Sequence, residues 1–133
     1  MQTLCSTDVD KDGNKKMNKL KYPVNIHDHF HAHVYFEQET LEFAKDLCKK
    51  AGDLFTLNVG RVHRKPVGPH PKWSCQITFS SNDFEHFIPW LENNRKGLSV
   101  LVHALTDDNL QDHTEYAYWL GNDVELNLDL LRS

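Results

Sequence analysis

The stretch His29-Phe-His-Ala-His-Val-Tyr-Phe36 decides how the rest of the chain folds. Apolar residues alternate in it with histidines and a tyrosine, and this period of two predicts a β-strand. Because successive side chains of a strand point to opposite faces, one face should pack into a core and the other should carry polar rings. Those rings belong to His29, His31, His33 and Tyr35.

The segments after this strand predict a mixed α and β domain. Hydrophobic spacing favours a helix over 41–51, strands over 55–59 and 73–79, a helix over 82–93 and a strand over 98–105. This β-α-β-β-α-β order is that of the ferredoxin-like fold, an α+β fold with an antiparallel sheet ordered 4-1-3-2 and both helices on one face. A parallel doubly wound sheet is disfavoured, because the second and third strands follow each other without a helix between them.

Local signals place the ends of these helices. Thr40 is expected to cap the first helix, and Gly52 to follow its last turn. Ser81 or Asn82 is expected to cap the second helix, which Pro89 should kink.

Beyond the fourth strand, the pattern predicts a short helix over 112–120 and an extra C-terminal strand over 124–130. The extra strand would add to an edge of the sheet or meet a second chain. We therefore expect a homodimer.

Composition limits the classes of protein to consider. The 133 residues suffice for one domain, and 39% hydrophobic with 26% charged residues is ordinary globular composition. A net charge of −4 argues against nucleic-acid binding, which requires a basic surface. No apolar run is long enough to span a membrane, and no signal peptide is evident, so we expect a cytoplasmic protein. Cys5, Cys48 and Cys75 form no C-x-x-C pair and are interpreted as reduced thiols.

Residues 1–25 are rich in Asp, Lys, Asn and Gly, and we expect a disordered leader there, followed by a single domain over 26–133. Within the leader, Asp8–Asn14 resembles the opening of an EF-hand calcium loop. The twelfth position of such a loop must supply a glutamate, and here it is Lys19. A solvated polar tail is therefore favoured over a calcium site.

Histidine is the unusual residue, with nine in the chain and four of them within residues 27–33. His31 and His33 should lie on the open face of the first strand. The 4-1-3-2 order places the fourth strand beside the first, so His103 should be a near neighbour of His31. Clustered neutral imidazoles are typical ligands of iron, copper or zinc. The alternative is a sheet face whose polar side chains contact only water.

Two further histidines lie where they could close over this face. The loop over 64–72 is longer than a hairpin needs, and its three prolines should hold His70 in one place. The loop and Arg61 are basic in an acidic chain and could receive an anionic substrate group, although ordinary surface charge is the alternative. His113, at the start of the short helix, should point inward. His63 belongs with Arg61, Arg64 and Lys65 to the basic group that could receive this anionic group. The other histidines, His27, His29 and His86, are expected in solvent.

Five short motifs, in this order along the chain, resemble the DOPA 4,5-dioxygenase family of aromatic ring-cleaving enzymes. They are His31–Phe36, Gly68–Pro71, Pro89–Leu91, Leu101–His103, and Asp112–Thr114 with Trp119–Gly121. The resemblance covers about residues 26–131. It implies a ferredoxin-like fold, a homodimer, a mononuclear non-haem iron(II) site, and extradiol cleavage by O2 of a catechol such as DOPA.

Roles follow from this resemblance as a hypothesis. The metal, Fe(II) or zinc or another divalent ion, is assigned to His31, His33 and His103. His70 and His113 are candidates for acid–base transfer, and the substrate is assigned to Tyr35, Gln76 and Arg61. Because non-haem iron oxygenases commonly use two histidines and a carboxylate, an acid from a loop could replace one histidine, although the all-histidine set is preferred. The loop acids are Glu37, Asp107, Asp108 and Asp112.

Two other functions stay open. A non-catalytic protein that binds a metal or a small ligand would use the same face without consuming oxygen. A zinc-dependent hydrolase or isomerase could use the same ligands, because imidazoles do not select iron over zinc.

Overall fold

The computed structural model describes residues 21–131. The calcium-loop-like run and residues 1–20 of the expected leader lie outside the described residues. Residues 21–25 form no helix or strand but are attached to the fold. The N–H of Trp119 donates to the Lys21 carbonyl at 2.9 Å, and the Asn25 amide donates to the Ser81 carbonyl at 3.1 Å.

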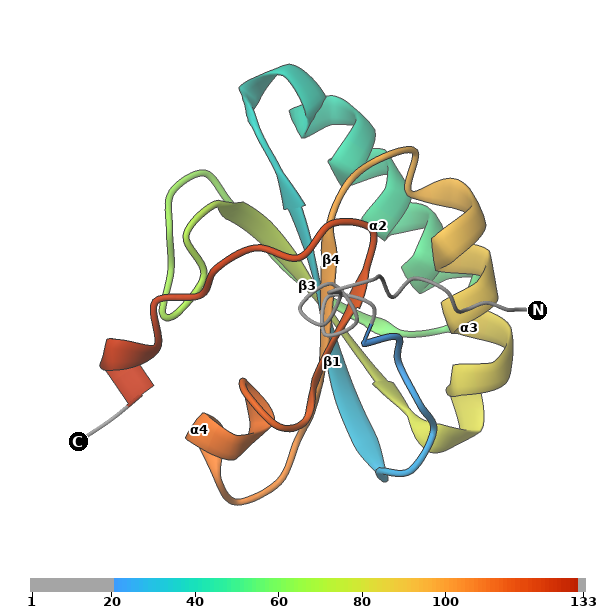
Figure 1. Ribbon diagram of the computed structural model, residues 1–133. Coiled ribbons are helices and arrows are strands. Elements are labelled where there is room, and N and C mark those ends of the chain that lie inside the picture. Colours follow the sequence, from blue (N-terminus) through green and yellow to red (C-terminus); the bar gives the residue numbers. More distant parts are fainter. Residues whose placement is uncertain (1–20, 132–133) are drawn as a thin grey trace, which may run out of the picture.

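Five strands form an antiparallel sheet in the order β2-β3-β1-β4-β5 (Figure 1). They are β1 (His29–Phe36), β2 (Asn58–His63), β3 (Trp73–Ser80), β4 (Val100–Ala104) and β5 (Ala117–Leu120). The first four have the predicted 4-1-3-2 order, which confirms the α+β, ferredoxin-like fold. The fifth strand extends the sheet beyond β4.

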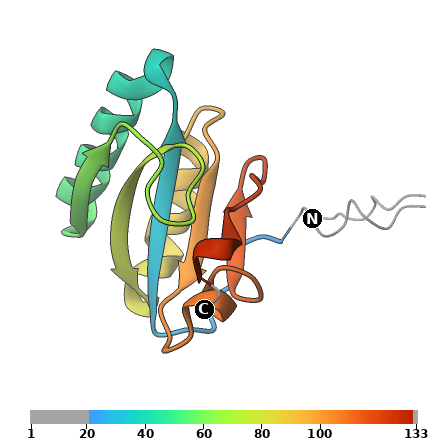
Figure 2. The same ribbon diagram turned by 90° about the vertical axis from the view of Figure 1, so that its left-hand side faces the viewer.

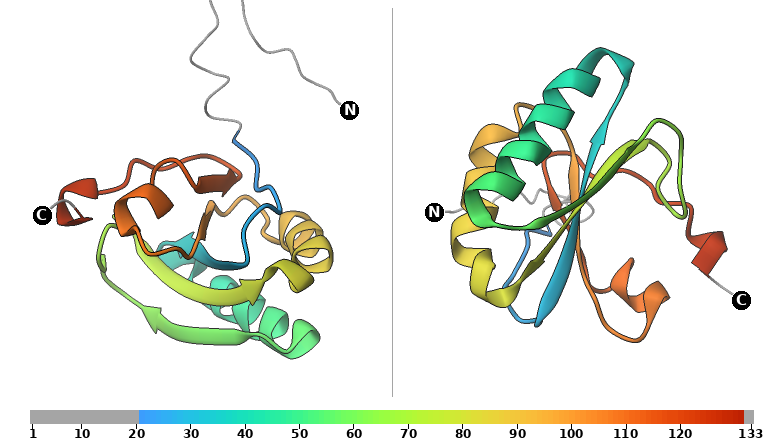
Figure 3. Two further views of the ribbon diagram at one scale, coloured as in Figure 1. Left: turned by 90° about the horizontal axis from the view of Figure 1, so that it is seen from below. Right: turned by 180° about the vertical axis from the view of Figure 1, so that it is seen from behind.

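Helices α2 (Leu41–Phe55) and α3 (Ser81–Asn94) lie side by side on one face of this sheet (Figures 1 and 3). The apolar side of β1 packs beneath them in the main core, with Phe30, Ala32, Val34 and Phe36 all buried. The other face carries the loop over 64–72, α4 (Asn109–Asp112) and the C-terminal segment (Figure 2). The alternation of β1 therefore sends its histidines to the face without α2 and α3.

Helix α2 runs one turn past its predicted end. Gly52 lies inside it, and Phe55, expected in the second strand, is its last residue. Phe55 packs edge-on against Phe87 of α3, at a centroid distance of 5.6 Å. Gly52 is needed for close packing, because a Cβ there would lie 2.8 Å from Cγ2 of Val59. Thr56, the residue after the helix, has a left-handed φ of 56° and caps its C-terminal end.

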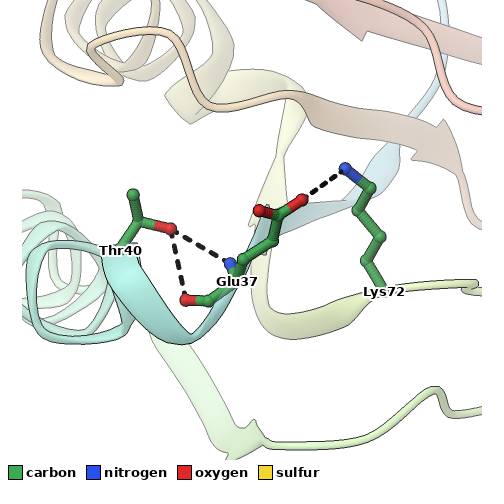
Figure 4. Close-up of polar contacts among 3 residues, drawn as sticks. All are labelled: Glu37, Thr40 and Lys72. Carbon is green, nitrogen blue, oxygen red and sulfur yellow. Dashed lines mark hydrogen bonds and ion pairs between the residues drawn. The ribbon is translucent and has the colours of Figure 1, made fainter.

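The helix caps also differ from the prediction. Thr40 does precede α2, but its hydroxyl accepts from the Glu37 N–H at 3.0 Å across the 3-10 turn η2 (Gln38–Thr40) (Figure 4). Ser80, rather than Ser81 or Asn82, caps α3: its hydroxyl accepts from the Asn82 N–H at 3.2 Å. Strand β3 thus runs directly into α3, which continues through Pro89 to Asn94.

The prediction of a helix over 112–120 is wrong. Only α4 is helical there, and Ala117–Leu120 pairs with β4 as strand β5. The pairing runs from Val100 with Leu120 to His103 with Ala117 and satisfies backbone groups of β4 that would otherwise be buried without partners.

The extra C-terminal strand is confirmed as β5, but its predicted position over 124–130 is wrong. This segment pairs with no strand and ends in the 3-10 helix η3 (Leu128–Leu131). Its side chains Val124 and Leu126 pack instead onto a small apolar cluster on the open face, built around Tyr35 and Leu101.

No helix among residues 21–131 has the length and apolar character needed to cross a bilayer. Cys48 and Cys75 are buried free thiols, as expected, whereas Cys5 lies outside the described residues.

Candidate active site

Three imidazoles meet on the open face near the middle of the sheet. His31 and His33 come from β1, and His103 comes from β4, where it pairs with His31. One nitrogen of each ring lies within 4.8 Å of the others. His31 is partly buried, whereas His33 and His103 are only 5% and 2% exposed. The neighbours predicted from strand order are therefore in contact range.

The surroundings keep these rings neutral. Burial is the main cause: it lowers the pKa of His33 well below its usual range and that of His103 to about 3, and nearby histidines add to both effects. The pKa of His31 is lowered by burial first and by His113 second. A neutral imidazole offers the lone pair that a metal ion requires.

Hydrogen bonds fix which nitrogen of His103 faces the cluster. Its Nδ1 donates to the Ala104 carbonyl at 2.8 Å, so Nε2 of the neutral ring carries the lone pair. Nε2 of His33 lies 3.0 Å away and must donate the proton between them. Two nitrogens bound to one metal at about 2.1 Å each lie roughly 3 to 3.5 Å apart. The pair therefore fits a metal ion in place of the shared proton.

A fourth ring, His70, reaches the cluster from the loop over 64–72. The loop folds back on itself, with the His70 N–H donating to the Val67 carbonyl at 3.0 Å. The ring centroids of His70 and His33 are 4.0 Å apart, and Nδ1 of His70 is 2.7 Å from the Tyr35 hydroxyl. Burial, followed by nearby imidazoles, lowers the pKa of His70 to about 4.

Two contacts hold this loop over the sheet. The Lys72 ammonium lies 3.1 Å from the Glu37 carboxylate just beyond β1 (Figure 4), although an exposed pair of this kind adds little stability. The Asn127 N–H donates to the Pro69 carbonyl at 2.8 Å, which ties the loop to the C-terminal segment. Prolines and these contacts together account for the fixed position of His70.

The fifth ring, His113, follows α4 instead of opening a helix. Its ring centroid lies 4.1 Å from that of His103 and 6.0 Å from that of His70. Its Nδ1 donates to the Asn109 carbonyl at 2.8 Å, which leaves the lone pair on Nε2. His113 thus points toward the cluster, as expected, although the helix predicted to carry it does not form.

Within residues 21–131, no carboxylate joins the three-imidazole group. Glu37, Asp107 and Asp108 are exposed. Asp112 is buried, but its two oxygens accept hydrogen bonds from the N–H and hydroxyl of Thr106, at 2.8 and 2.6 Å. The described residues therefore support the all-histidine alternative.

A cavity of about 180 Å³ opens beside His33 and His70. Its walls include the predicted Gln76, which pairs with His33 in the sheet, together with Ser74 and His63. The sequence placed His63 only in the basic group beside the loop and did not predict its position in this cavity, because a register shift in β2 decides its direction. The shift pairs His63 with Ser74, an open-face residue, whereas an unbroken ladder would turn it to the helical face.

Arg61 and Tyr35 do not line this cavity. Arg61 is exposed in the irregular part of β2. Tyr35 is 2% exposed, and its hydroxyl lies 2.7 Å from Nδ1 of His70.

The remaining histidines lie away from the cluster. His29 and His86 are exposed, as expected. His27 was expected in solvent, which is wrong: it is partly buried, and its Nε2 is 2.8 Å from the Tyr118 hydroxyl. The cause is that the segment before β1 packs beside β5, with the His27 ring 4.7 Å from that of Tyr116.

A model of the Dopa 4,5-dioxygenase family matches residues 30–130. The chain belongs to this family. A DOPA 4,5-dioxygenase from Amanita muscaria is 34% identical over 108 residues, 74% of this chain and 47% of the relative. An uncharacterized 21.2 kDa protein from Botryotinia fuckeliana is 32% identical over 151 residues, 95% of this chain and 82% of the relative. The crystal structure of a presumed dioxygenase from Nostoc punctiforme matches with a TM-score of 0.77 and 42% identity, covering 80% of this chain and 92% of that one.

Membership of the Dopa 4,5-dioxygenase family confirms the resemblance seen in the sequence and supports a dioxygenase function. The Nostoc structure supports the same fold. Because this chain covers 47% of the Amanita enzyme, the substrate and partners of that longer protein do not transfer directly.

Proposed function

We propose that this member of the Dopa 4,5-dioxygenase family is an extradiol dioxygenase that cleaves a catechol such as DOPA at a mononuclear metal site. One observation carries the proposal: three neutral imidazoles present nitrogens within 4.8 Å of one another, with two more imidazoles packed against them. His31, His33 and His103 would hold the metal. Fe(II) is the proposed ion, although a zinc or other divalent ion also suits imidazole ligands.

The metal and the side chains would divide the chemistry. Bound Fe(II) would supply the redox chemistry with O2, which no side chain of the cluster can provide. The surrounding residues would bind the ring, exclude water and move protons. The loop over 64–72 and the C-terminal segment would provide the cover, because both lie over the open face (Figure 2).

His113 and His70 would act as base and acid. The lone pair on Nε2 of His113 can accept a catechol proton, because its Nδ1 is already committed to Asn109. The Tyr35 hydroxyl, by donating to Nδ1 of His70, would leave the proton on Nε2 of that ring. As the acid, His70 would donate a hydrogen bond through this N–H to the oxygen that gains negative charge as the ring opens, and protonated His113 would return its proton to the product.

Gln76 and His63 would bind the substrate, since both line the cavity beside His33. A cavity of about 180 Å³ suits a single aromatic ring better than a large ligand. Arg61 would act from the surface by attracting an anionic substituent.

The test is anaerobic reconstitution of the full chain with Fe(II), followed by addition of 3,4-dihydroxyphenylalanine in air-saturated buffer. We expect oxygen consumption and a yellow ring-opened product. Metal binding without oxygen uptake across a panel of catechols would instead indicate a metal carrier.

A cytoplasmic homodimer is also proposed. Because 124–130 forms no strand, the dimer edge expected from that segment is absent, and the edges left by the described residues are β2 and β5. Light scattering coupled to size-exclusion chromatography tests the dimer.

A further inference from the structure

A buried carboxylate that forms no ion pair with a lysine or arginine among residues 21–131 lies directly before His113, whose ring centroid is 4.1 Å from that of His103. Asp112 is 0% exposed and is the last residue of α4. Its side-chain hydrogen bonds come from the N–H and hydroxyl of Thr106, at 2.8 and 2.6 Å. No lysine or arginine among residues 21–131 forms an ion pair with it. Two hydrogen bonds offset only part of the cost of burying a carboxylate.

Short chain segments connect Asp112 to the proposed metal site, because its oxygens accept from Thr106, three residues after His103, and His113 follows it directly. Burial and His113 lower the pKa of His31, and Asp112 is the group that opposes them. The same carboxylate also opposes the lowering of the His27 pKa by burial. No histidine among the described residues forms an ion pair with Asp112 either.

A divalent ion held by three neutral imidazoles would carry a positive charge that its ligands do not compensate. Its ligands contribute no negative charge, so its full charge remains in a buried site. The ion and Asp112 would therefore compensate each other.

We propose that Asp112 is a positioning residue that raises the affinity of the histidine site for a divalent cation by its buried charge, without ligating the ion. Direct ligation is disfavoured because both carboxylate oxygens already accept from Thr106 and Asp112 is outside the group of close ligand atoms. The inference rests on the proposed function only in that His31, His33 and His103 bind such an ion.

The test compares metal affinity in variants of the full chain. Metal-stripped protein is titrated with Zn²⁺, and anaerobically with Fe²⁺, in competition with a chromophoric chelator. Asp112→Asn removes the charge and keeps an oxygen that can accept from Thr106, and we expect about tenfold weaker binding of both ions. The matched control is Asp108→Asn, because Asp108 is exposed and accepts from the Gln111 N–H at the start of the same helix. Its affinity should stay within about twofold of wild type.

A second variant separates charge from loop geometry. Thr106→Val removes the hydroxyl donor and keeps the carboxylate, so the melting temperature of the metal-free protein should fall while metal affinity stays within about threefold of wild type. Asp112→Ser provides another neutral side chain if the amide is not tolerated, with the same expected loss of affinity.

Three results would overturn the inference. Wild-type affinity in a folded, neutral Asp112 variant would show that the charge has no effect. An equal loss in Thr106→Val would show that the loop position, and not the charge, matters. A wild-type protein that binds neither ion would remove the proposed metal site and this inference with it.

Discussion

The contact between His33 and His103 is the feature on which the site depends most. Their Nε2 atoms are 3.0 Å apart, and the Ala104 carbonyl fixes the tautomer of His103. Such an outer hydrogen bond is what orients a ligating imidazole in metal sites. Neighbouring strands supply the two rings, so the spacing is set by the sheet and not by a flexible loop.

Replacing His33 or His103 by alanine should abolish metal retention, because each supplies a lone pair that no neighbour in the three-imidazole group can replace. We expect bound Fe or Zn to fall at least about tenfold after gel filtration, measured by elemental analysis. His86→Ala, on the exposed side of α3, is the control and should keep its metal. Wild-type metal content in the His33 and His103 variants would refute their assignment.

Tyr35→Phe should slow turnover without weakening substrate binding. The change removes the partner of Nδ1 of His70 and leaves the ring packing in place. We expect kcat to fall by about tenfold or more, with KM changed less than about twofold. Tyr22→Phe, at an exposed position, is the control. A raised KM with unchanged kcat would instead indicate that Tyr35 contacts the substrate directly.

At the scale of elements, the junction of β3 and α3 determines how the second helix starts. Ser80→Ala removes the cap and should lower the free energy of unfolding by about 1 kcal/mol, measured by urea denaturation. Ser81→Ala, one residue along, should change it by less than about 0.5 kcal/mol. A larger loss in Ser81→Ala than in Ser80→Ala would instead indicate that Ser81, which the sequence favoured, caps α3.

Element order and the faces of β1 were predictable because a period of two over eight residues has few alternatives. The strand order predicted that His31 and His103 would be near neighbours, and the structure pairs them directly. The failures were segments whose structure depends on distant partners. Ala117–Leu120 is a strand only because β4 needs a neighbour, and alternation at Phe55 and Leu57 hid the last turn of α2.

Parts of the site were hidden for similar reasons. His63 enters the cavity because of the register shift in β2, which no local pattern reveals. Tyr35 was correctly placed on the open face, but its contact with His70 depends on how a long loop folds back. Sequence periodicity predicts faces, whereas contacts between a loop and a sheet require the three-dimensional structure.

At the scale of the whole molecule, the sheet separates two environments. The helical side is an apolar core, and the open side buries neutral imidazoles beneath a loop and the C-terminal segment. The helical face therefore contributes the apolar core that stabilises the fold, and the open face carries the proposed active site.

Burial of neutral imidazoles should make the metal-free protein sensitive to acid. The folded pKa values of His70 and His103 are about 4 and about 3, below the unfolded value of about 6.5, so the unfolded chain binds more protons between these limits. Stability should be fully present above pH 6.5 and should fall as the pH drops toward 4 and then 3. Each of the two rings should account for a loss of roughly 3 kcal/mol by pH 4, measured by urea denaturation in chelator.

His70→Gln removes one of these buried imidazoles and should make that loss smaller. Stability that is unchanged between pH 7 and pH 4 in the unsubstituted chain would contradict the assignment of buried, neutral rings.

The most direct test of the account is a crystal of the full chain loaded anaerobically with Fe(II) and measured on both sides of the iron absorption edge. The account predicts one anomalous peak within bonding distance of a nitrogen from each of His31, His33 and His103. A peak bound by other residues, or no peak in crystals grown from protein shown to contain iron, would contradict it.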